Sequence, residues 1–235
     1  MLKYESMKEK FLSYGIELTE EQNYKFERYY EFLIEENSKF NITAITDREE
    51  VILKHFIDSA LGLKLISEKN NLTLVDIGSG GGFPAIPIKI MRPDIKMTLI
   101  ESTGKKCNFL KNLCKLLKLN DVEIICDRAE NLAKELKYRE KFDYCTARAV
   151  AYLPTLTEYC LPFVKLNGRF LAYKSDAEEE IKASSNALNI LGGRIEKIES
   201  FLLDGAARTL VLIEKIKKTD LKYPRGNGKE RKNPL

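Results

Sequence analysis

The stretch that decides the fold is Leu72–Pro84, which reads LTLVDIGSGGGFP and continues as AIPI over residues 85–88. A short apolar, β-branched run ends at an acid, and four glycines among five residues and a proline follow it. This order predicts a buried strand, a tight loop and a helix N-terminus. Because glycine has no Cβ, the loop can hold a small molecule against its backbone. Pro84 suits the first helical position, where a missing N–H costs nothing.

The residues after the glycines indicate which small molecule the loop binds. A dinucleotide-binding G-x-G-x-x-G would place its third glycine where Phe83 stands. A P-loop needs a lysine directly after its last glycine, and the first lysine here is Lys89. The pattern D-x-G-x-G-x-G is formed by Asp76, Gly78, Gly80 and Gly82. It resembles motif I of the S-adenosylmethionine-dependent methyltransferases, whose cofactor carries no phosphate, although a structural turn in another α/β protein is an alternative.

Two further strands end in residues that suit a nucleoside. The predicted strand 96–101 ends in Glu101, about one strand–helix–strand unit after Asp76. An acid there can accept hydrogen bonds from both ribose hydroxyls, although an exposed strand-end acid is an equal alternative. The predicted strand 122–126 is followed by Asp127-Arg128-Ala129-Glu130, where methyltransferases hold an adenine ring. The same four residues are also typical of a capping box, with Asp127 as N-cap.

The predicted strand 142–147 leads into Arg148, which indicates the substrate side. An amino-methylating enzyme would carry Asn/Asp-Pro-Pro-aromatic there, and a cytosine C5 enzyme a nucleophilic cysteine; neither occurs. Arg148 can hydrogen-bond a guanine O6 or a phosphate, and Lys174, at the end of the predicted strand 168–174, projects to the same edge. An acceptor with a free lone pair, such as purine N7, needs no base, so positioning and water exclusion can suffice. The alternatives are an ion-paired arginine and a simple strand-end lysine.

The net charge of +4 is unevenly distributed along the chain. Residues 1–70 hold 10 basic and 14 acidic side chains, whereas residues 215–235 hold eight basic and two acidic ones. The basic C-terminal residues, Arg225 among them, predict contact with a phosphate backbone. A solvated, frayed terminus is the alternative.

Composition narrows the class of protein. No apolar run approaches the roughly 20 residues of a membrane span, and the N-terminus lacks the basic-then-apolar pattern of a leader. With one histidine, His55, and no C-x-x-C pair, we predict no metal site. We expect small buried thiols in a reducing cytosol, and hence a cytoplasmic protein. The cysteines are Cys107, Cys114, Cys126, Cys145 and Cys160.

Residues 1–70 differ in pattern from the rest of the chain. Thr19 with Gln22, and Asp47 with Glu50, are capping-box starts before apolar residues at helical spacing. We therefore predict a helical N-terminal extension over 1–70, a methyltransferase domain over 71–216 and a basic tail over 217–235.

From Leu72 onward short strands alternate with helices. The predicted strands cover about 72–77, 96–101, 122–126, 142–147, 168–174, 194–201 and 208–216. The predicted helices lie near 85–91, 104–118, 130–137, 153–164 and 176–190. Such alternation predicts an α/β fold, a Rossmann-like, mostly parallel seven-stranded sheet with helices on both faces. Because the link from 201 to 208 is too short for a helical crossover, the last two strands should pair antiparallel, giving an antiparallel edge strand.

Ligands in such sheets bind at the carboxyl ends of the strands, beside the topological switch point. One crevice should therefore be surrounded by the loop at Gly78, the acid Glu101, the residues Ala129 and Glu130, and the residues after 147.

Seven short motifs together form an ordered set along the chain. They are NITAI (41–45), HFIDS (55–59), DIGSGGGFPAIP (76–87), ESTGKKCNFL (101–110), RAE (128–130), TARA (146–149) and YPR (223–225). With this set the chain resembles, over nearly its whole length, the RsmG family, also called glucose-inhibited division protein B. These proteins are class I S-adenosylmethionine-dependent methyltransferases that act on N7 of a guanine in 16S ribosomal RNA.

The resemblance implies S-adenosylmethionine as methyl donor and 16S ribosomal RNA of the small ribosomal subunit as substrate, in the bacterial cytoplasm. Gly78 and Phe83 would line the methionine and ribose part, Glu101 would take the ribose, and Ala129 and Glu130 would lie beside the adenine. The implied cofactor-binding set is Asp76, Gly78, Gly80, Gly82, Phe83, Glu101, Ser102, Thr103, Ala129, Glu130 and Arg148. The implied RNA-binding set is His55, Arg148, Lys174 and Arg225, of which Arg148 and Lys174 would orient the base and act in catalysis. Asp58 and Ser59 would approach the crevice with His55.

The sequence departs from the family pattern at two places. Ala85 stands where the family usually has glycine, and Arg225 is followed by Gly226 and Asn227 where the family usually has Lys-x-Gly. We expect a monomer. Two rival functions remain at this point: a nicotinamide-dependent reductase, which Phe83 disfavours, and a non-catalytic RNA-binding or ribosome assembly module.

Overall fold

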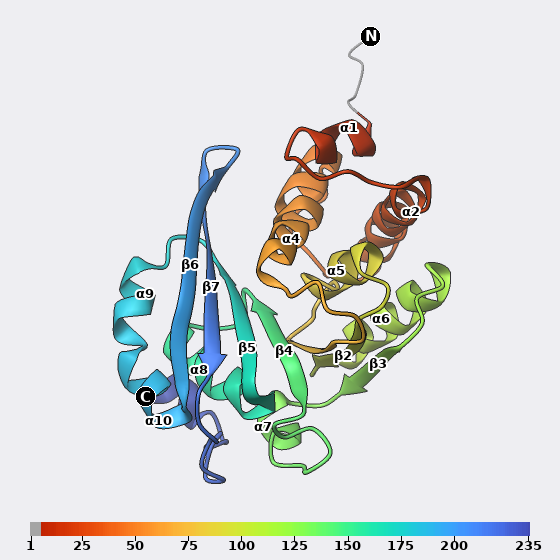
Figure 1. Cartoon of the computed structure of the whole chain (residues 1–235). Coiled ribbons are helices and arrows are strands. Elements are labelled where there is room, and N and C mark those ends of the chain that lie inside the picture. The colour runs from red at the N-terminus through yellow and green to blue at the C-terminus, as the bar shows by residue number, and fades with distance from the viewer. Residues whose placement is uncertain (1–5) are drawn as a thin grey trace.

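The computed structural model describes residues 6–235 and has three layers, with a mixed sheet between two layers of helices (Figure 1). The sheet has seven strands in the order β3-β2-β1-β4-β5-β7-β6. The strands are β1 (Thr73–Ile77), β2 (Lys96–Glu101), β3 (Val122–Cys126), β4 (Phe142–Arg148), β5 (Val164–Lys174), β6 (Gly193–Leu203) and β7 (Ala206–Lys215). β1 to β5 are parallel, and β7 is antiparallel to both β5 and β6. The predicted fold is confirmed, with β7 placed between β5 and the edge strand β6.

Helices cover both faces of the sheet (Figure 1). On one face α5 and α6 pack with the N-terminal helices α2 and α4, and on the other α8 packs with α7, α9 and α10. The first helices are α1 (Met7–Leu12), α2 (Glu20–Asn37), α3 (Arg48–Val51), α4 (Asp58–Leu61), α5 (Ala85–Met91) and α6 (Gly104–Leu116). The later ones are α7 (Ala129–Leu132), α8 (Leu153–Cys160), α9 (Glu178–Ala183), α10 (Ser185–Leu191) and α11 (Lys229–Lys232).

β1 shows how a central strand serves both layers. Leu74 belongs to the apolar cluster on the side of α5 and α6, whereas Val75 and Ile77 belong to the cluster on the side of α8 and α10. Successive side chains of a strand point to opposite faces, and a parallel strand covered on both faces is mostly apolar. This is why the run before the glycines is largely apolar, with Asp76 as its buried exception.

The N-terminal helices pack on the glycine loop. The capping box of α2 is confirmed, since the Gln22 N–H donates to Thr19 Oγ1 over 3.2 Å and the Thr19 N–H donates to Gln22 Oε1 over 2.9 Å. From α2, the Tyr29 hydroxyl donates to the Gly81 carbonyl. Asp47 caps α3 by accepting from the Glu50 N–H over 3.0 Å. The division of the chain at residues 70 and 216 stays a prediction.

Two helices in the C-terminal half differ in length or number from the prediction. The helix expected over 130–137 ends at Leu132, and turns follow until Glu140, whose φ is +52°. The helix expected over 176–190 is two helices, which meet at Ser184. The Ser184 hydroxyl donates to the Ile181 carbonyl over 2.7 Å, a local bond that competes with helix continuation.

Three smaller expectations also need correction. Pro84 is the residue before α5 and not its first residue. Asp127 forms no capping box, because its Oδ1 accepts from the adjacent Arg128 N–H over 2.6 Å, and Arg128 is the N-cap of α7. Of the five cysteines, Cys126 is exposed, because it ends the edge strand β3.

Candidate functional site

The glycine loop joins β1 to α5 in a conformation that its residues need. Gly78 and Gly82 have φ values of +70° and +94°, a region that other residues adopt only with strain. A Cβ on Gly78 would also lie 2.7 Å from Cγ2 of Val150, and one on Gly82 would lie 2.7 Å from the Tyr29 hydroxyl oxygen. The glycines therefore let the loop pack closely against the segment after β4 and against α2.

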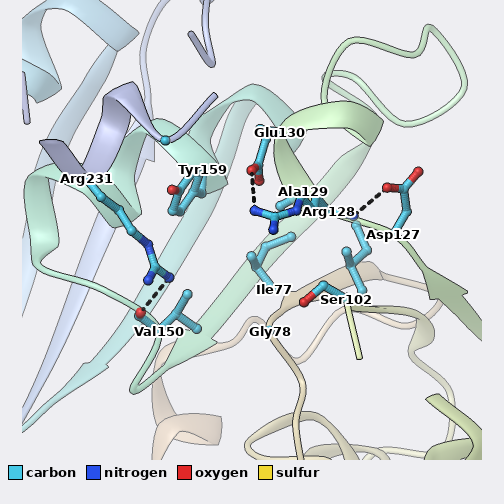
Figure 2. Close-up of a pocket in the computed structure, with 12 residues that line it drawn as sticks. Ile77, Gly78, Ser102, Asp127, Arg128, Ala129, Glu130, Val150, Tyr159 and Arg231 are labelled. Atoms are coloured by element: carbon cyan, nitrogen blue, oxygen red, sulfur yellow. Dashed lines mark hydrogen bonds and ion pairs between the residues drawn. The ribbon is translucent and has the colours of Figure 1, made fainter. Parts of the chain in front are cut away.

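A first pocket, of about 340 Å³, opens where β1, β2 and β3 end (Figure 2). Its volume lies in the range of small-molecule sites, and its position is the switch point between β1 and β4. The residues that line it are Ile77, Gly78, Ile100, Ser102, Asp127, Arg128, Ala129, Glu130, Val150, Tyr159, Gly228 and Arg231. Four residues of the predicted cofactor set, Gly78, Ser102, Ala129 and Glu130, thus come together around one cavity.

Glu101 and Thr103 lie next to this pocket without lining it. The Glu101 carboxylate accepts from the Gly80 N–H over 2.9 Å and from the Thr103 N–H over 2.8 Å. It therefore fastens the glycine loop to the end of β2. Each carboxylate oxygen can accept more than one hydrogen bond, so the predicted ribose contact stays a prediction.

Asp76 is a fully buried carboxyl group below the glycine loop. Its Oδ1 accepts from the Thr146 hydroxyl over 2.7 Å, and its Oδ2 has no hydrogen-bond partner within residues 6–235. Burial raises the pKa of Asp76 to about 7, against the opposing effects of Thr146, Ser79 and Arg148. An acid poised near neutrality and left with a free acceptor is typical of a functional site.

Phe83 does not line the first pocket, because its ring is taken up in an aromatic stack. The ring lies 4.4 Å from that of His55 and 5.3 Å from that of Tyr29, measured between centroids. On the same ring lies the guanidinium of Arg148, with its carbon 5.0 Å from the centroid. Phe83 thus supports Arg148 and His55, and its expected contact with a cofactor stays a prediction.

A second pocket, of about 330 Å³, lies beside the ends of β4 and β5. It is lined by Ile45, Lys54, His55, Asp58, Arg148, Ala149, Tyr173, Lys174, Ser175, Asp176, Glu180 and Arg208. Ala149 lines this second pocket, whereas its neighbour Val150 lines the first. The left-handed conformation of Ala149, with φ +56°, turns the chain at this point. The loop that leaves β4 is therefore the partition between the two pockets.

The predicted substrate residues His55, Arg148 and Lys174 all meet at the second pocket. Arg148 forms an ion pair of 2.8 Å with Asp58 and donates to the Lys54 carbonyl over 2.9 Å. Asp58 is buried and also pairs with Arg208 over 3.2 Å. The orientation of the Arg148 guanidinium is therefore fixed by residues of the N-terminal segment.

Lys174 has its own protein partners. Its Nζ lies 2.5 Å from a Glu180 carboxylate oxygen and donates to the Ala151 carbonyl over 2.9 Å. Since Ala151 follows the partition loop, Lys174 fixes the position of that loop. Its predicted catalytic role stays a prediction, and the contacts it makes are those of a positioning residue.

His55 is neutral at the second pocket. Burial, and then the charge of Arg148, lower its pKa to about 3. Its Nδ1 lies 3.1 Å from an Arg148 nitrogen, and its Nε2 lies 2.8 Å from the Thr43 hydroxyl oxygen. Nδ1 also lies 3.1 Å from the Lys54 carbonyl oxygen; because arginine can only donate and a carbonyl can only accept, these two contacts require opposite tautomers of the neutral ring. His55 also lies in a π-helical turn, Ile52–Ile57, a distortion often found at functional sites.

The guanidinium of Arg225 has partners inside the protein, and its predicted RNA contact stays a prediction. It forms a two-pronged ion pair with Glu158, which is fully buried, with distances of 3.0 Å from Nε and 2.7 Å from Nη2. Nη2 also donates to the Asn233 carbonyl over 2.8 Å. The C-terminal segment is thus fastened to α8.

Among the residues that line the first pocket, sequence reasoning did not name as site residues Ile77, Ile100, Tyr159, Gly228 and Arg231, whereas Val150 falls in the stretch after residue 147 that was expected at the crevice. The two tail residues, Gly228 and Arg231, carried no local signal, because they reach the pocket only through tertiary contacts.

Two kinds of feature are not found in the described part of the chain. No helix over residues 6–235 is long and apolar enough to cross a membrane. Within the same residues no group of three or more His, Cys, Asp or Glu side chains is placed to hold a metal ion.

Comparisons with known proteins agree with this geometry. The family model described as GidB, rRNA small subunit methyltransferase G, matches residues 22–211. The chain is 48% identical over 224 residues to a ribosomal RNA small subunit methyltransferase G of Acetivibrio thermocellus, covering 94% of this chain and 92% of that protein. A protein of the same name from Staphylococcus epidermidis is 44% identical over 234 residues, covering 98% of both chains.

Solved structures share the fold at low identity. A methyltransferase from Pyrococcus furiosus gives a TM-score of 0.55 at 16% identity, covering 68% of this chain and 83% of that one. TYW2 of M. jannaschii, solved in complex with AdoMet, gives 0.53 at 18% identity, covering 68% and 76%.

Proposed function

We propose a function from the premise that the chain belongs to the rRNA small subunit methyltransferase G family. The protein transfers a methyl group from S-adenosylmethionine to N7 of a guanine in 16S ribosomal RNA. It acts as a monomer in the bacterial cytoplasm, on RNA of the small ribosomal subunit.

One observation carries this proposal: the two pockets meet at a single loop. Val150 lines the first pocket and Ala149 the second, and Arg148 stands where β4 enters this loop. A transferase must hold donor and acceptor on either side of a short gap and in line. The two cavities lie against the same loop and are therefore neighbours; in-line transfer requires that they open to each other past this loop when donor and acceptor are bound.

The first pocket fits S-adenosylmethionine by its residues. Gly78 offers bare backbone, Ala129 and Glu130 offer a place beside an adenine, and Glu101 lies next to the pocket as a ribose acceptor. Below the loop Asp76 has a free buried acceptor oxygen. When bound, this cofactor supplies a methyl group activated on a sulfonium. Phe83 stands where a dinucleotide-binding loop has its third glycine, which disfavours a dinucleotide.

The residues of the second pocket position a base without removing a proton from it. His55 is neutral, and both of its ring nitrogens lie within hydrogen-bond distance of protein atoms, so neither is free to act as a base toward substrate. Arg148 is fixed by Asp58 and by the ring of Phe83, which leaves a rigid, planar cation at the pocket wall. Such a group suits the O6 edge of a guanine or a phosphate. N7 of guanine has a free lone pair, so its attack requires orientation and exclusion of water.

The proposal is tested by chemical cleavage of ribosomal RNA. N7-methylguanine is labile to borohydride and aniline, so 16S RNA from cells that contain the protein should be cut at one additional guanine. That cut should vanish when the gene is deleted and return when the wild-type protein is supplied. An Arg148→Ala protein should fail to restore it, whereas Arg169→Ala, which removes an exposed pair with Glu196, should restore it. An unchanged cleavage pattern after deletion would contradict the proposal.

A further inference from the structure

The last thirteen residues fold back onto the first pocket. Tyr223 is buried at 9% exposure, and its carbonyl accepts from Arg139 over 2.9 Å. Arg139 also binds the Thr219 and Asp220 carbonyls, over 2.8 and 3.0 Å. The segment therefore starts from a fixed point, whereas free chain ends are usually mobile unless they are tied down.

Two buried carboxylates hold the segment further along. Glu158 binds the Arg225 guanidinium, as described above, and also accepts from the Arg225 backbone N–H over 2.8 Å. Glu230 is fully buried: one carboxylate oxygen accepts from the Gly226 N–H, and its carbonyl accepts from the Thr155 hydroxyl over 2.8 Å. The contacts of Arg225 with Glu158 and of the Glu230 carbonyl with Thr155 both end on α8. These contacts fix the backbone at Glu230, and therefore also the position of the next residue.

That next residue, Arg231, lines the first pocket together with Gly228. Its Nη2 donates to the Val150 carbonyl over 3.4 Å, a long bond that leaves the other guanidinium donors available. Within residues 6–235 it has no carboxylate partner at ion-pair distance, whereas Arg128 across the pocket is paired with Glu130 (Figure 2). Arg231 and Ala129 lie on opposite sides of the same cavity (Figure 2). An adenine held beside Ala129 would therefore have the Arg231 guanidinium on its other side.

From this arrangement we propose that the C-terminal segment is a wall of the cofactor site, and that Arg231 binds the nucleoside part of the cofactor. The inference rests on the proposed function, which places the adenine beside Ala129 and Glu130. A guanidinium can stack on the face of an adenine or donate to its ring nitrogens. Binding of the cofactor then depends on residues near the very end of the chain, beyond the last strand of the sheet.

Calorimetric titration with two ligands tests the proposal. S-adenosylhomocysteine carries the whole cofactor skeleton, and 5′-methylthioadenosine carries the nucleoside without the amino acid. We expect Arg231→Ala and Arg231→Gln to raise the Kd of both ligands about tenfold, which is the effect of losing one good contact. Lys232→Ala is the matched control, because Lys232 is an exposed cation on the same short helix and does not line the pocket.

The outcomes separate this inference from the proposed function. If the wild-type protein binds neither ligand, the proposed function itself fails. If the wild type binds both ligands and the Arg231 variants bind them as tightly as Lys232→Ala does, only the role of Arg231 is overturned. The same result is expected if Arg231 contacts RNA and not the cofactor. A loss seen with S-adenosylhomocysteine alone would also overturn the inference, since Arg231 would then contact the amino-acid part. Because both Arg231 variants change an exposed side chain, we expect their melting temperatures to match the control.

Discussion

The guanidinium carbon of Arg148 lies 5.0 Å from the centre of the Phe83 ring. The residue after the glycine loop and the last residue of β4 therefore meet directly, between the two pockets. Phe83 is held in turn by Tyr29 and His55. Through this contact the glycine loop, the N-terminal helices and the second pocket fix one another's positions.

Removal of the Arg148 side chain should affect turnover more than cofactor binding. Arg148→Ala loses the ion pair with Asp58 and the contact with Phe83. The guanine of the substrate is then no longer oriented by the guanidinium. We expect the single-turnover rate of methylation of small subunits to fall about 100-fold, and the Kd of S-adenosylhomocysteine to change less than about threefold. Arg148→Lys should also be slow, because it keeps the charge but not the planar fork. Equal losses in rate and in cofactor affinity would place Arg148 in cofactor binding alone.

A methyl group added at Gly78 should damage the cofactor pocket. Gly78→Ala combines left-handed strain at φ +70° with a Cβ 2.7 Å from Val150. We expect calorimetry to show at least a tenfold weaker Kd for S-adenosylhomocysteine. Gly15→Ala is the matched control, because Gly15 has φ +73° with open space around its Cβ position. It should lose about 1 kcal/mol of stability and bind the ligand normally; normal binding by Gly78→Ala would contradict the assignment of the pocket.

The buried carboxyl of Asp76 should make stability fall as the pH rises. Burial raises its pKa from 3.8 to about 7 in the folded state, so the folded protein favours the protonated form. The stabilisation is complete below the unfolded pKa and is lost as the pH rises through the folded one. Between pH 5 and pH 8 this group should cost about 2–3 kcal/mol of the free energy of unfolding.

Asp76→Asn isolates this contribution, since it cannot ionise. Urea denaturation of both proteins across that range should show a steeper decline for the wild type than for the variant. Parallel curves would mean that Asp76 is already ionised, and therefore solvated or paired, in the folded state.

Loss of Arg225 should destabilise the protein through the charge it leaves behind. Arg225→Ala leaves the fully buried Glu158 without its partner, and breaking such a pair costs several kcal/mol. Because the Arg225 side chain is 24% exposed, we expect about 2–3 kcal/mol by urea denaturation. Lys222→Ala, which removes a side chain that is 67% exposed, should stay within about 0.5 kcal/mol of the wild type. A similarly small effect for Arg225→Ala would show that the tail is not fastened to α8.

Much of the fold could be predicted because its signals are local. β2 and β3 have the predicted bounds, as does α5, since short apolar runs between turn residues leave little choice of structure. The glycine loop was visible for the same reason. Four residues of the predicted cofactor set line the first pocket, and three residues of the predicted RNA set line the second.

The parts that were missed depend on contacts between distant residues. Arg225 and Glu158 are 67 positions apart, and no local pattern links a basic tail to a buried acid on α8. The partition between the pockets depends on the left-handed conformation of Ala149. An alanine in a sequence gives no indication of such a conformation. The stacking of Phe83 against Tyr29 of α2 and His55 of the π-helical turn also joins residues that are distant in the sequence, and no local pattern indicated it.

The most direct test of the central claim, that the first pocket is built for S-adenosylmethionine, is a calorimetric titration of the wild-type protein with that ligand and with NADH. We expect one S-adenosylmethionine per chain with a Kd in the micromolar range, about −8 kcal/mol, and no heat of binding with NADH. Binding of NADH, or of neither ligand, by folded protein would contradict it.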